Sequence, residues 1–123
     1  MFSNFESSGR HLLIDIRGIK NTDVICNKEA VMNLMNAICE ELDLGILNKN
    51  HFQFDNGAIT AIYMLRESHL SFHSYPEKDF VAMDLYSCRQ YGNDDVLKHT
   101  AAFIITVLGG SLESDVRVID RRF

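Results

Sequence analysis

The 123-residue chain contains no tryptophan, a single proline and three cysteines. Because Cys26, Cys39 and Cys88 show no C-x-x-C spacing and cannot all pair within one chain, the sequence indicates neither a zinc knuckle nor a disulfide framework. Positive charge is also scarce, and a formal net charge of -5 argues against a protein that binds the phosphate backbone of nucleic acids. We expect no bound metal and no nucleic-acid partner. The negative net charge favours a cationic ligand over an anionic one.

Long apolar runs are missing too. No window approaches the ~20 apolar residues of a membrane-spanning helix, and residues 1–6 lack the basic and apolar regions of a secretory signal. With 46% hydrophobic and 24% charged residues, the composition is that of an ordinary soluble globular protein. We therefore expect one cytoplasmic domain over residues 1–123, without a membrane partner.

The pattern of apolar residues predicts two main helices and a series of strands. One helix is expected from the N-cap Asn27 to Gly45 and the other from Asn93 to Gly109. Strands are expected over residues 10–17, 51–54, 58–65, 68–75, 80–88 and 115–120. This order indicates an α+β fold, a two-layer sandwich with both helices on one face of an antiparallel sheet. The other face needs a cover, and a second copy of the chain is the natural candidate.

The most informative segment runs from residue 66 to residue 88. It begins Arg66-Glu67-Ser68-His69-Leu70-Ser71-Phe72-His73, passes through a Pro76-Glu77 turn and ends in Asp84-x-x-x-Cys88. Taken singly, these residues have ordinary interpretations, such as an edge serine, a strand histidine and a buried core thiol. Taken together, they resemble the self-cleaving S-adenosylmethionine decarboxylases, and Gly9-Arg10-His11 resembles the opening of the same family.

The resemblance implies that Ser68 becomes the cofactor. In that family, the bond between glutamate and serine rearranges to an ester, β-elimination releases the upstream chain, and the remaining dehydroalanine hydrolyses to a covalent pyruvoyl group. Carried to this chain, the break falls between Glu67 and Ser68 and gives a β chain of residues 1–67 and an α chain of residues 68–123. The pyruvoyl ketone then forms a Schiff base with the substrate amine and accepts electrons during decarboxylation.

The same resemblance implies roles for three further residues. His73 matches the histidine that abstracts a proton during processing, which suits an imidazole. Thr60 stands where the family has a serine whose hydroxyl assists the rearrangement, and Cys88 matches the acid that returns a proton to the substrate carbon. Because strict strand alternation would put Ser68 and His73 on opposite faces, we expect a turn or irregular backbone where the strand begins.

Substrate contacts are implied for Phe54, Tyr75, Glu77 and Arg89. The ordinary interpretation of the two aromatic residues is sheet core, but the family has aromatic residues here that sandwich an adenine ring. Glu77 is otherwise a solvated turn charge. Tryptophan is common in the family at the position of Tyr75 and glycine at that of Arg89. A guanidinium beside the site would repel a sulfonium but hold a carboxylate.

The remaining histidines and one cysteine have ordinary structural interpretations. His11, His51, His69 and His99 are expected to be half-buried strand residues, and Cys39 a buried thiol on the apolar side of the first helix. By default, none of them is assigned a part in the chemistry.

These observations predict a pyruvoyl-dependent decarboxylase that feeds spermidine synthesis and works as a homodimer of cleaved protomers with sites near the subunit interface. S-adenosylmethionine is the first-choice substrate. L-ornithine or L-arginine is the alternative, with the same pyruvoyl chemistry. A second alternative is an inactive homologue that does not cleave and serves as a binding subunit, although the retention of Ser68, His73 and Cys88 argues against it.

Overall fold

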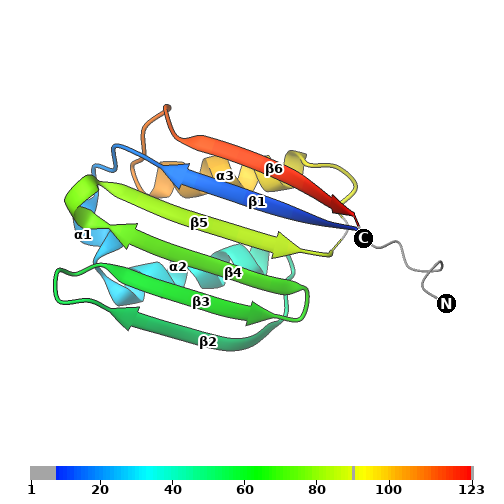
Figure 1. Cartoon of the computed structure of the whole chain (residues 1–123), viewed down its shortest axis with the longest axis horizontal. Coiled ribbons are helices and arrows are strands. Elements are labelled where there is room, and N and C mark those ends of the chain that lie inside the picture. The colour runs from blue at the N-terminus through cyan, green and yellow to red at the C-terminus, as the bar shows by residue number, and fades with distance from the viewer. Residues whose placement is uncertain (1–7, 90, 123) are drawn as a thin grey trace.

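A six-stranded antiparallel sheet forms one layer of the protein, and the helices pack behind it as a second layer (Figure 1). The computed structural model describes residues 8–89 and 91–122, so residues 1–6, which bear on the expected lack of a leader, lie outside them. The elements in chain order are β1 (Ser8–Ile16), α1 (Thr22–Ile25), α2 (Lys28–Glu41), β2 (Ile46–Gln53), β3 (Ile59–Leu65), β4 (Ser68–Tyr75), η2 (Pro76–Lys78), β5 (Phe80–Ser87), α3 (Asp95–Val107) and β6 (Asp115–Arg122). The strand order is β2-β3-β4-β5-β1-β6. The predicted α+β class and the antiparallel sheet are confirmed.

Alternation along the strands decides which face of the sheet is buried. Every second residue of β3 and β5 faces the helices and is buried, namely Ile59, Ala61, Tyr63, Leu65, Val81, Met83, Leu85 and Ser87. The helices contribute the apolar side chains that recur at helical spacing, namely Val31, Leu34, Met35, Ile38, Leu97, Ala101 and Ile104. One hydrophobic core therefore fills the space between the two layers.

Helix α2 begins where the sequence predicts and ends earlier. The side chain of Asn27 accepts a hydrogen bond from the backbone N–H of Ala30 at 3.0 Å, which confirms the predicted N-cap. The helix ends at Glu41 because Asp43 adopts a left-handed conformation with φ of 56°. Gly45 therefore does not stop the helix, as the sequence suggested, but lies in the connection that leads into β2.

Two other boundaries differ from the sequence-based expectation. Strand β2 begins at Ile46 rather than at residue 51, and every one of its residues is exposed because it is an edge strand. Its first half, rich in asparagine and lysine, shows no alternation of apolar and polar residues, so pattern reasoning could not detect it. Strand β5 ends at Ser87, which leaves Cys88 just beyond the strand, and the short helix α1 was not predicted.

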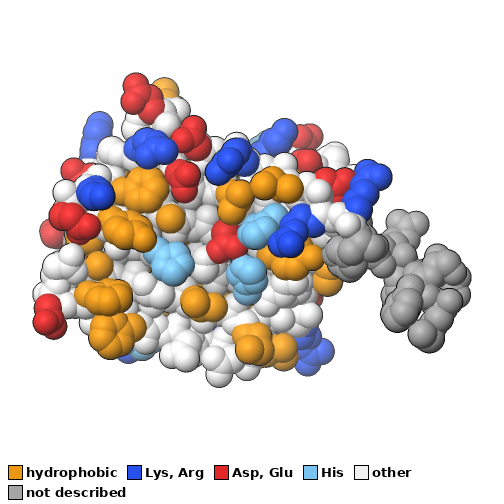
Figure 2. Space-filling view, in the orientation of Figure 1, with side chains coloured by type: hydrophobic (Ala, Val, Ile, Leu, Met, Phe, Trp, Pro, Cys, Tyr) orange, Lys and Arg blue, Asp and Glu red, His pale blue; other side chains and the backbone are white. Residues whose placement is uncertain are grey.

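The face of the sheet opposite the helices carries mixed side chains over its whole width (Figure 2). We call it the open face. Its exposed apolar residues include Phe52, Ile62, Met64, Tyr75 and Ile119. Histidines and a carboxylate lie near its centre. Among the described residues, no helix is long and apolar enough to cross a membrane.

Candidate active site

The predicted site residues fall into two groups at opposite ends of the sheet (Figure 1). Near the β3–β4 turn and the end of β5 lie Glu67, Ser68, Cys88 and Arg89, and we call this group the cleavage end. Near the β2–β3 and β4–β5 connections lie Phe54, Thr60, His73, Tyr75 and Glu77, and we call this group the aromatic end. Ser68 and His73 are five positions apart on one extended strand, which corresponds to about 16 Å. The two groups therefore do not meet within one copy of the chain.

Ser68 has an unusual backbone conformation. It is the first residue of β4, where it pairs with Leu65 across the two-residue β3–β4 turn and with Ser87 of β5. Its φ is 146°, in the region that favours glycine, so an L-residue there is strained. The expected irregular backbone at the start of this strand is confirmed. Burial alternates along β4 from Phe72 onwards, and His73 lies on the open face beside Thr60.

Glu67, on the other side of the predicted scissile bond, is held by hydrogen bonds to two other segments. Its carbonyl oxygen accepts from the backbone N–H of Cys88 at 3.2 Å. Its carboxylate accepts from the backbone N–H of Gly45 at 3.0 Å, and the Gly45 carbonyl accepts from the N–H of Arg66 at 2.8 Å. A Cβ at position 45 would lie 2.7 Å from Cδ of Arg66, so a larger residue there would have to displace the flexible Arg66 side chain. The turn that carries the bond is therefore fixed on both of its edges.

Cys88 and Arg89 complete the cleavage end, and both are exposed. The Cys88 backbone reaches the Glu67 carbonyl, which brings the cysteine beside the Glu67–Ser68 bond as the sequence resemblance implied. The Arg89 guanidinium is bound to the Asp43 carboxylate at 2.8 Å. This ion pair holds the Arg89 guanidinium near the end of α2 and partly neutralises its charge.

At the aromatic end, Thr60 and His73 face each other from paired positions of β3 and β4. The Thr60 hydroxyl lies 3.3 Å from His73 Nδ1, within hydrogen-bonding distance. Both side chains are half-buried, and Thr60 also lines a groove of about 340 Å³ on the open face. A hydroxyl and an imidazole in contact can pass a proton between them, which fits the implied roles of both residues in processing.

Phe54 and Tyr75 are not sheet core. Half of the Phe54 surface and 42% of that of Tyr75 are exposed, because Phe54 follows the end of an edge strand and Tyr75 ends β4 on the open face. Phe54 contacts Phe52 edge to face at 4.9 Å, and Tyr75 lies 5.8 Å from Phe80 between ring centroids. Tyr75 and Phe80 line a cavity of about 490 Å³. The core interpretation is thus wrong, and the rings are accessible to a ligand.

Glu77 is an exposed residue of the turn η2, and its carboxylate accepts a hydrogen bond from the side chain of Asn56 at 3.3 Å. This contact joins the β4–β5 connection to the β2–β3 connection. It brings a negative charge to the aromatic end, where a cationic ligand would be favoured.

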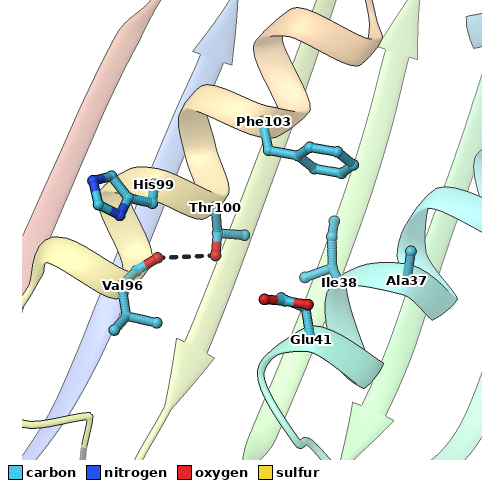
Figure 3. A pocket seen from close by; sticks show the side chains of 7 residues that line it. All are labelled: Ala37, Ile38, Glu41, Val96, His99, Thr100 and Phe103. Atoms are coloured by element: carbon cyan, nitrogen blue, oxygen red, sulfur yellow. Dashed lines mark hydrogen bonds between the residues drawn. The ribbon is translucent and has the colours of Figure 1, made fainter.

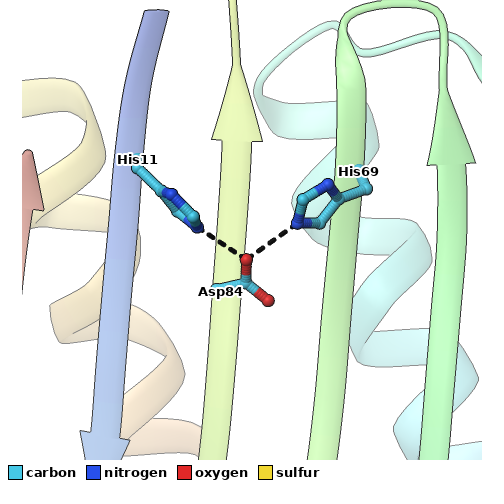
Figure 4. A group of neighbouring side chains, drawn as sticks. All are labelled: His11, His69 and Asp84. Carbon is cyan, nitrogen blue, oxygen red and sulfur yellow. Dashed lines mark hydrogen bonds and ion pairs between the residues drawn. The ribbon is translucent and has the colours of Figure 1, made fainter. Parts of the chain in front are cut away.

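Sequence reasoning missed a hydrogen-bonded cluster at the centre of the open face (Figure 4). Asp84 Oδ2 accepts from His11 at 2.7 Å and from His69 at 2.8 Å, and the hydroxyl of Ser71 donates to Oδ1. We call these four residues the Asp84 cluster. Burial opposes ionisation of Asp84, but the hydrogen bonds from Ser71, His11 and His69 outweigh it and lower the pKa of the carboxyl. Alternation along β4 predicts that residues 69, 71 and 73 share one face, but it does not predict that residues 69 and 71 lie beside Asp84 of β5.

The other ordinary interpretations have mixed outcomes. His11 and His69 are half-buried strand residues as expected, whereas His51 is fully exposed on β2 and His99 lies on helix α3. Cys39 is buried as expected, and burial raises its pKa to about 11.

A cavity of about 510 Å³ lies between α2 and α3, in the helical layer (Figure 3). Its lining includes Glu41, His99 and Phe103. Thr100, which also lines it, donates its hydroxyl to the Val96 carbonyl at 2.9 Å and is thereby satisfied. None of the predicted site residues lines this cavity, so it is separate from both ends of the site described above.

The fold and site define a two-layer α+β protein with a strained serine at one hairpin, and comparison with known proteins gives its family. The family model for S-adenosylmethionine decarboxylase matches residues 10–121. The chain belongs to this family, as the motif over residues 67–88 predicted.

Individual relatives match this chain over most of their own length. The S-adenosylmethionine decarboxylase proenzyme of Picrophilus torridus is 32% identical over 121 residues, which are 91% of this chain and 92% of that protein. The S-adenosylmethionine decarboxylase proenzyme 2 of Bacillus cereus is 32% identical over 68% of each chain. The crystal structure of the adenosylmethionine decarboxylase from Aquifex aeolicus matches with a TM-score of 0.80 at 26% identity and covers 97% of this chain and 94% of that one.

Proposed function

We propose that this chain is a proenzyme that cleaves itself between Glu67 and Ser68 and then decarboxylates S-adenosylmethionine in the cytoplasm, as a step toward spermidine. The observation that carries the proposal is the conformation and hydrogen bonding of the residues on either side of the predicted scissile bond. Ser68 is strained at φ of 146°, and the carbonyl that it would attack already accepts a hydrogen bond from the Cys88 N–H at 3.2 Å. Strain raises the energy of the ground state, and a donor on the carbonyl stabilises the oxyanion of the addition step.

The cleavage chemistry balances with groups of this chain and water. The Ser68 hydroxyl oxygen adds to the Glu67 carbonyl carbon, the C–N bond breaks, and the ester leaves a free amine on Ser68. Removal of the Ser68 Cα proton then breaks the Cβ–Oγ bond, which releases the Glu67 carboxylate and leaves dehydroalanine. Water replaces its nitrogen, and ammonia leaves. The pyruvoyl group that results supplies an electron sink for loss of carbon dioxide from an α-amino acid.

The separation of Ser68 from His73 argues that a working site needs two copies of the chain. At about 16 Å along one strand, His73 cannot reach the Ser68 of its own copy. A homodimer that pairs two open faces would place the aromatic end of one copy over the cleavage end of the other and would cover exposed Ile62 and Met64. Thr60 and His73 of one copy would then serve the bond of its partner.

The substrate assignment follows from the family and from the aromatic end. The relatives described above are S-adenosylmethionine decarboxylases, which favours the first-choice substrate over L-ornithine or L-arginine. Exposed Phe54 and Tyr75 offer faces for an adenine ring, and Glu77 offers a negative charge for a sulfonium. We assign to Cys88 the return of a proton to the substrate carbon, and the exposure of its thiol at the cleavage end supports this role.

Mass spectrometry of the denatured protein tests the cleavage. Two chains that join between residues 67 and 68 are expected, the second without a free amino terminus, and Ser68→Ala should remain intact because it lacks the attacking oxygen. His73→Ala should cleave much more slowly. A wild-type chain that stays whole after prolonged incubation would remove the pyruvoyl mechanism and favour the inactive-homologue alternative.

A further inference from the structure

The Asp84 cluster joins three neighbouring strands, since His11 lies on β1, Asp84 on β5, and His69 and Ser71 on β4 (Figure 4). The side chains of His11 and Asp84 are 19% and 23% exposed, so water competes weakly for the hydrogen bond between them, whereas the His69 side chain is 40% exposed. Arg121 of β6 extends the cluster, because its guanidinium lies 3.4 Å from His11 Nδ1. The proposed function assigns no role to any of these residues.

The contact with Arg121 indicates which ring nitrogen of His11 carries the proton. A guanidinium can only donate, so its contact leaves His11 Nδ1 as an acceptor and places the proton on Nε2, which then donates to Asp84. With His69 and Ser71, the carboxylate accepts three hydrogen bonds. A metal ion would need the Nε2 atoms without protons, and the nearby guanidinium charge would oppose it. The arrangement is therefore that of an anchored carboxylate rather than of a metal centre.

The anchor lies next to the predicted scissile bond in the sequence. His69 directly follows Ser68, and its ring is tied to Asp84 at 2.8 Å. On the other side of Ser68, Glu67 is tied to Cys88 and Gly45. A strained backbone conformation persists when its surroundings hold both flanks. Without the His69 contact, only the backbone pairing of β4 with β3 and β5 would hold the carboxyl side of Ser68, so φ of Ser68 could relax more easily.

We propose that Asp84 is a positioning residue for self-cleavage: through its hydrogen bond to His69, it holds Ser68 in the strained conformation from which the hydroxyl attacks Glu67. This inference rests on the proposed cleavage at Glu67–Ser68. In this inference, Asp84 does not contact the reacting atoms. The His69 side chain links Asp84 to Ser68.

The test compares cleavage rates of freshly purified wild type, Asp84→Asn, His69→Ala and His69→Gln by mass spectrometry of the denatured chains. Asp23→Asn is the control, because Asp23 is an exposed carboxylate of helix α1, away from the open face. His69→Ala and Asp84→Asn should cleave slower by on the order of 10- to 100-fold, as expected when a reacting group is misplaced. His69→Gln should recover most of the rate, since the glutamine amide can donate from the place of Nε2. The control should match wild type.

Two companion measurements separate positioning from a general structural effect. Each variant is also made with Ser68→Ala, and the thermal midpoint and the mass in solution of the uncleaved protein are measured. Slow cleavage with both properties retained supports the inference. It is overturned if Asp84→Asn and His69→Ala cleave at the wild-type rate, or if their slow cleavage accompanies unfolding or a change of assembly, or if His69→Gln is as slow as His69→Ala. A wild-type chain that does not cleave would instead end the proposed function, and this inference with it.

Discussion

Cys88 lies just past β5 with its thiol exposed, and its backbone N–H donates to the Glu67 carbonyl. We propose that its backbone and its side chain serve different steps. Replacement of the thiol leaves the N–H in place. Cys88→Ala should therefore still cleave at Glu67–Ser68 but lose turnover by the ~10²- to 10⁴-fold typical of a positioned acid. Chain masses and carbon dioxide release, measured on the same preparation, check this. Full turnover in that variant would return Cys88 to a structural role.

Phe54 tests the substrate. If an adenine ring stacks on this exposed side chain, Phe54→Ala should raise KM for S-adenosylmethionine about tenfold, because the loss of about 1.4 kcal/mol of binding energy is one decade. Glu77→Gln should weaken binding of a sulfonium, since it removes a negative charge from the aromatic end.

The comparison of three substrates gives the control for both variants. Ornithine and arginine lack an adenine, so their turnover should depend little on Phe54, and Arg89 or Glu77 would dominate their binding. Carbon dioxide release from a basic amino acid alone, insensitive to Phe54→Ala, would contradict the S-adenosylmethionine assignment and leave the cleavage chemistry intact.

Single residues differ in how far the sequence predicts them. Ser68, His73 and Cys88 were assigned from the resemblance of residues 67–88 to a known family. The need for irregular backbone at Ser68 followed from strand alternation once that resemblance gave Ser68 and His73 roles in one site. The hydrogen bonds of Asp84 did not follow, because they depend on the register of β1 and β4 against β5. Long-range register is set by the whole sheet and leaves no local signature.

At the scale of elements, local signals predicted what local physics determines. The Asn27 cap and the helical spacing of apolar residues located α2, and alternation located β3 and β5. The predicted start of edge strand β2 was five residues too late, because neither face of this strand is buried and its first half has no apolar alternation. Phe54 and Tyr75 were misjudged for a related reason, since a strand pattern gives no information about which ends remain uncovered.

At the scale of the whole molecule, the separation of the two ends predicts complementation between copies. Uncleaved Ser68→Ala chains mixed and refolded with His73→Ala chains should form mixed dimers in which the Ser68 of one chain meets the His73 of the other. With random pairing, about half of the His73→Ala chains should then cleave. Mass spectrometry of the mixture reports the fraction.

The control is each variant refolded alone, where neither should cleave appreciably. No cleavage in the mixture, with mixed dimers present by native mass, would mean that His73 acts within its own copy after a rearrangement or not at all.

Strand β1 precedes the Glu67–Ser68 bond in the chain, yet in the sheet it lies between β5 and β6, which follow that bond (Figure 1). A cut there would leave two interleaved fragments, joined by the β3–β4, β5–β1 and β1–β6 ladders. To pull one fragment out would break all three ladders together. The cleaved protein would therefore stay a single folded body until it is denatured, and the new chain end at residue 68 would keep its place beside Cys88.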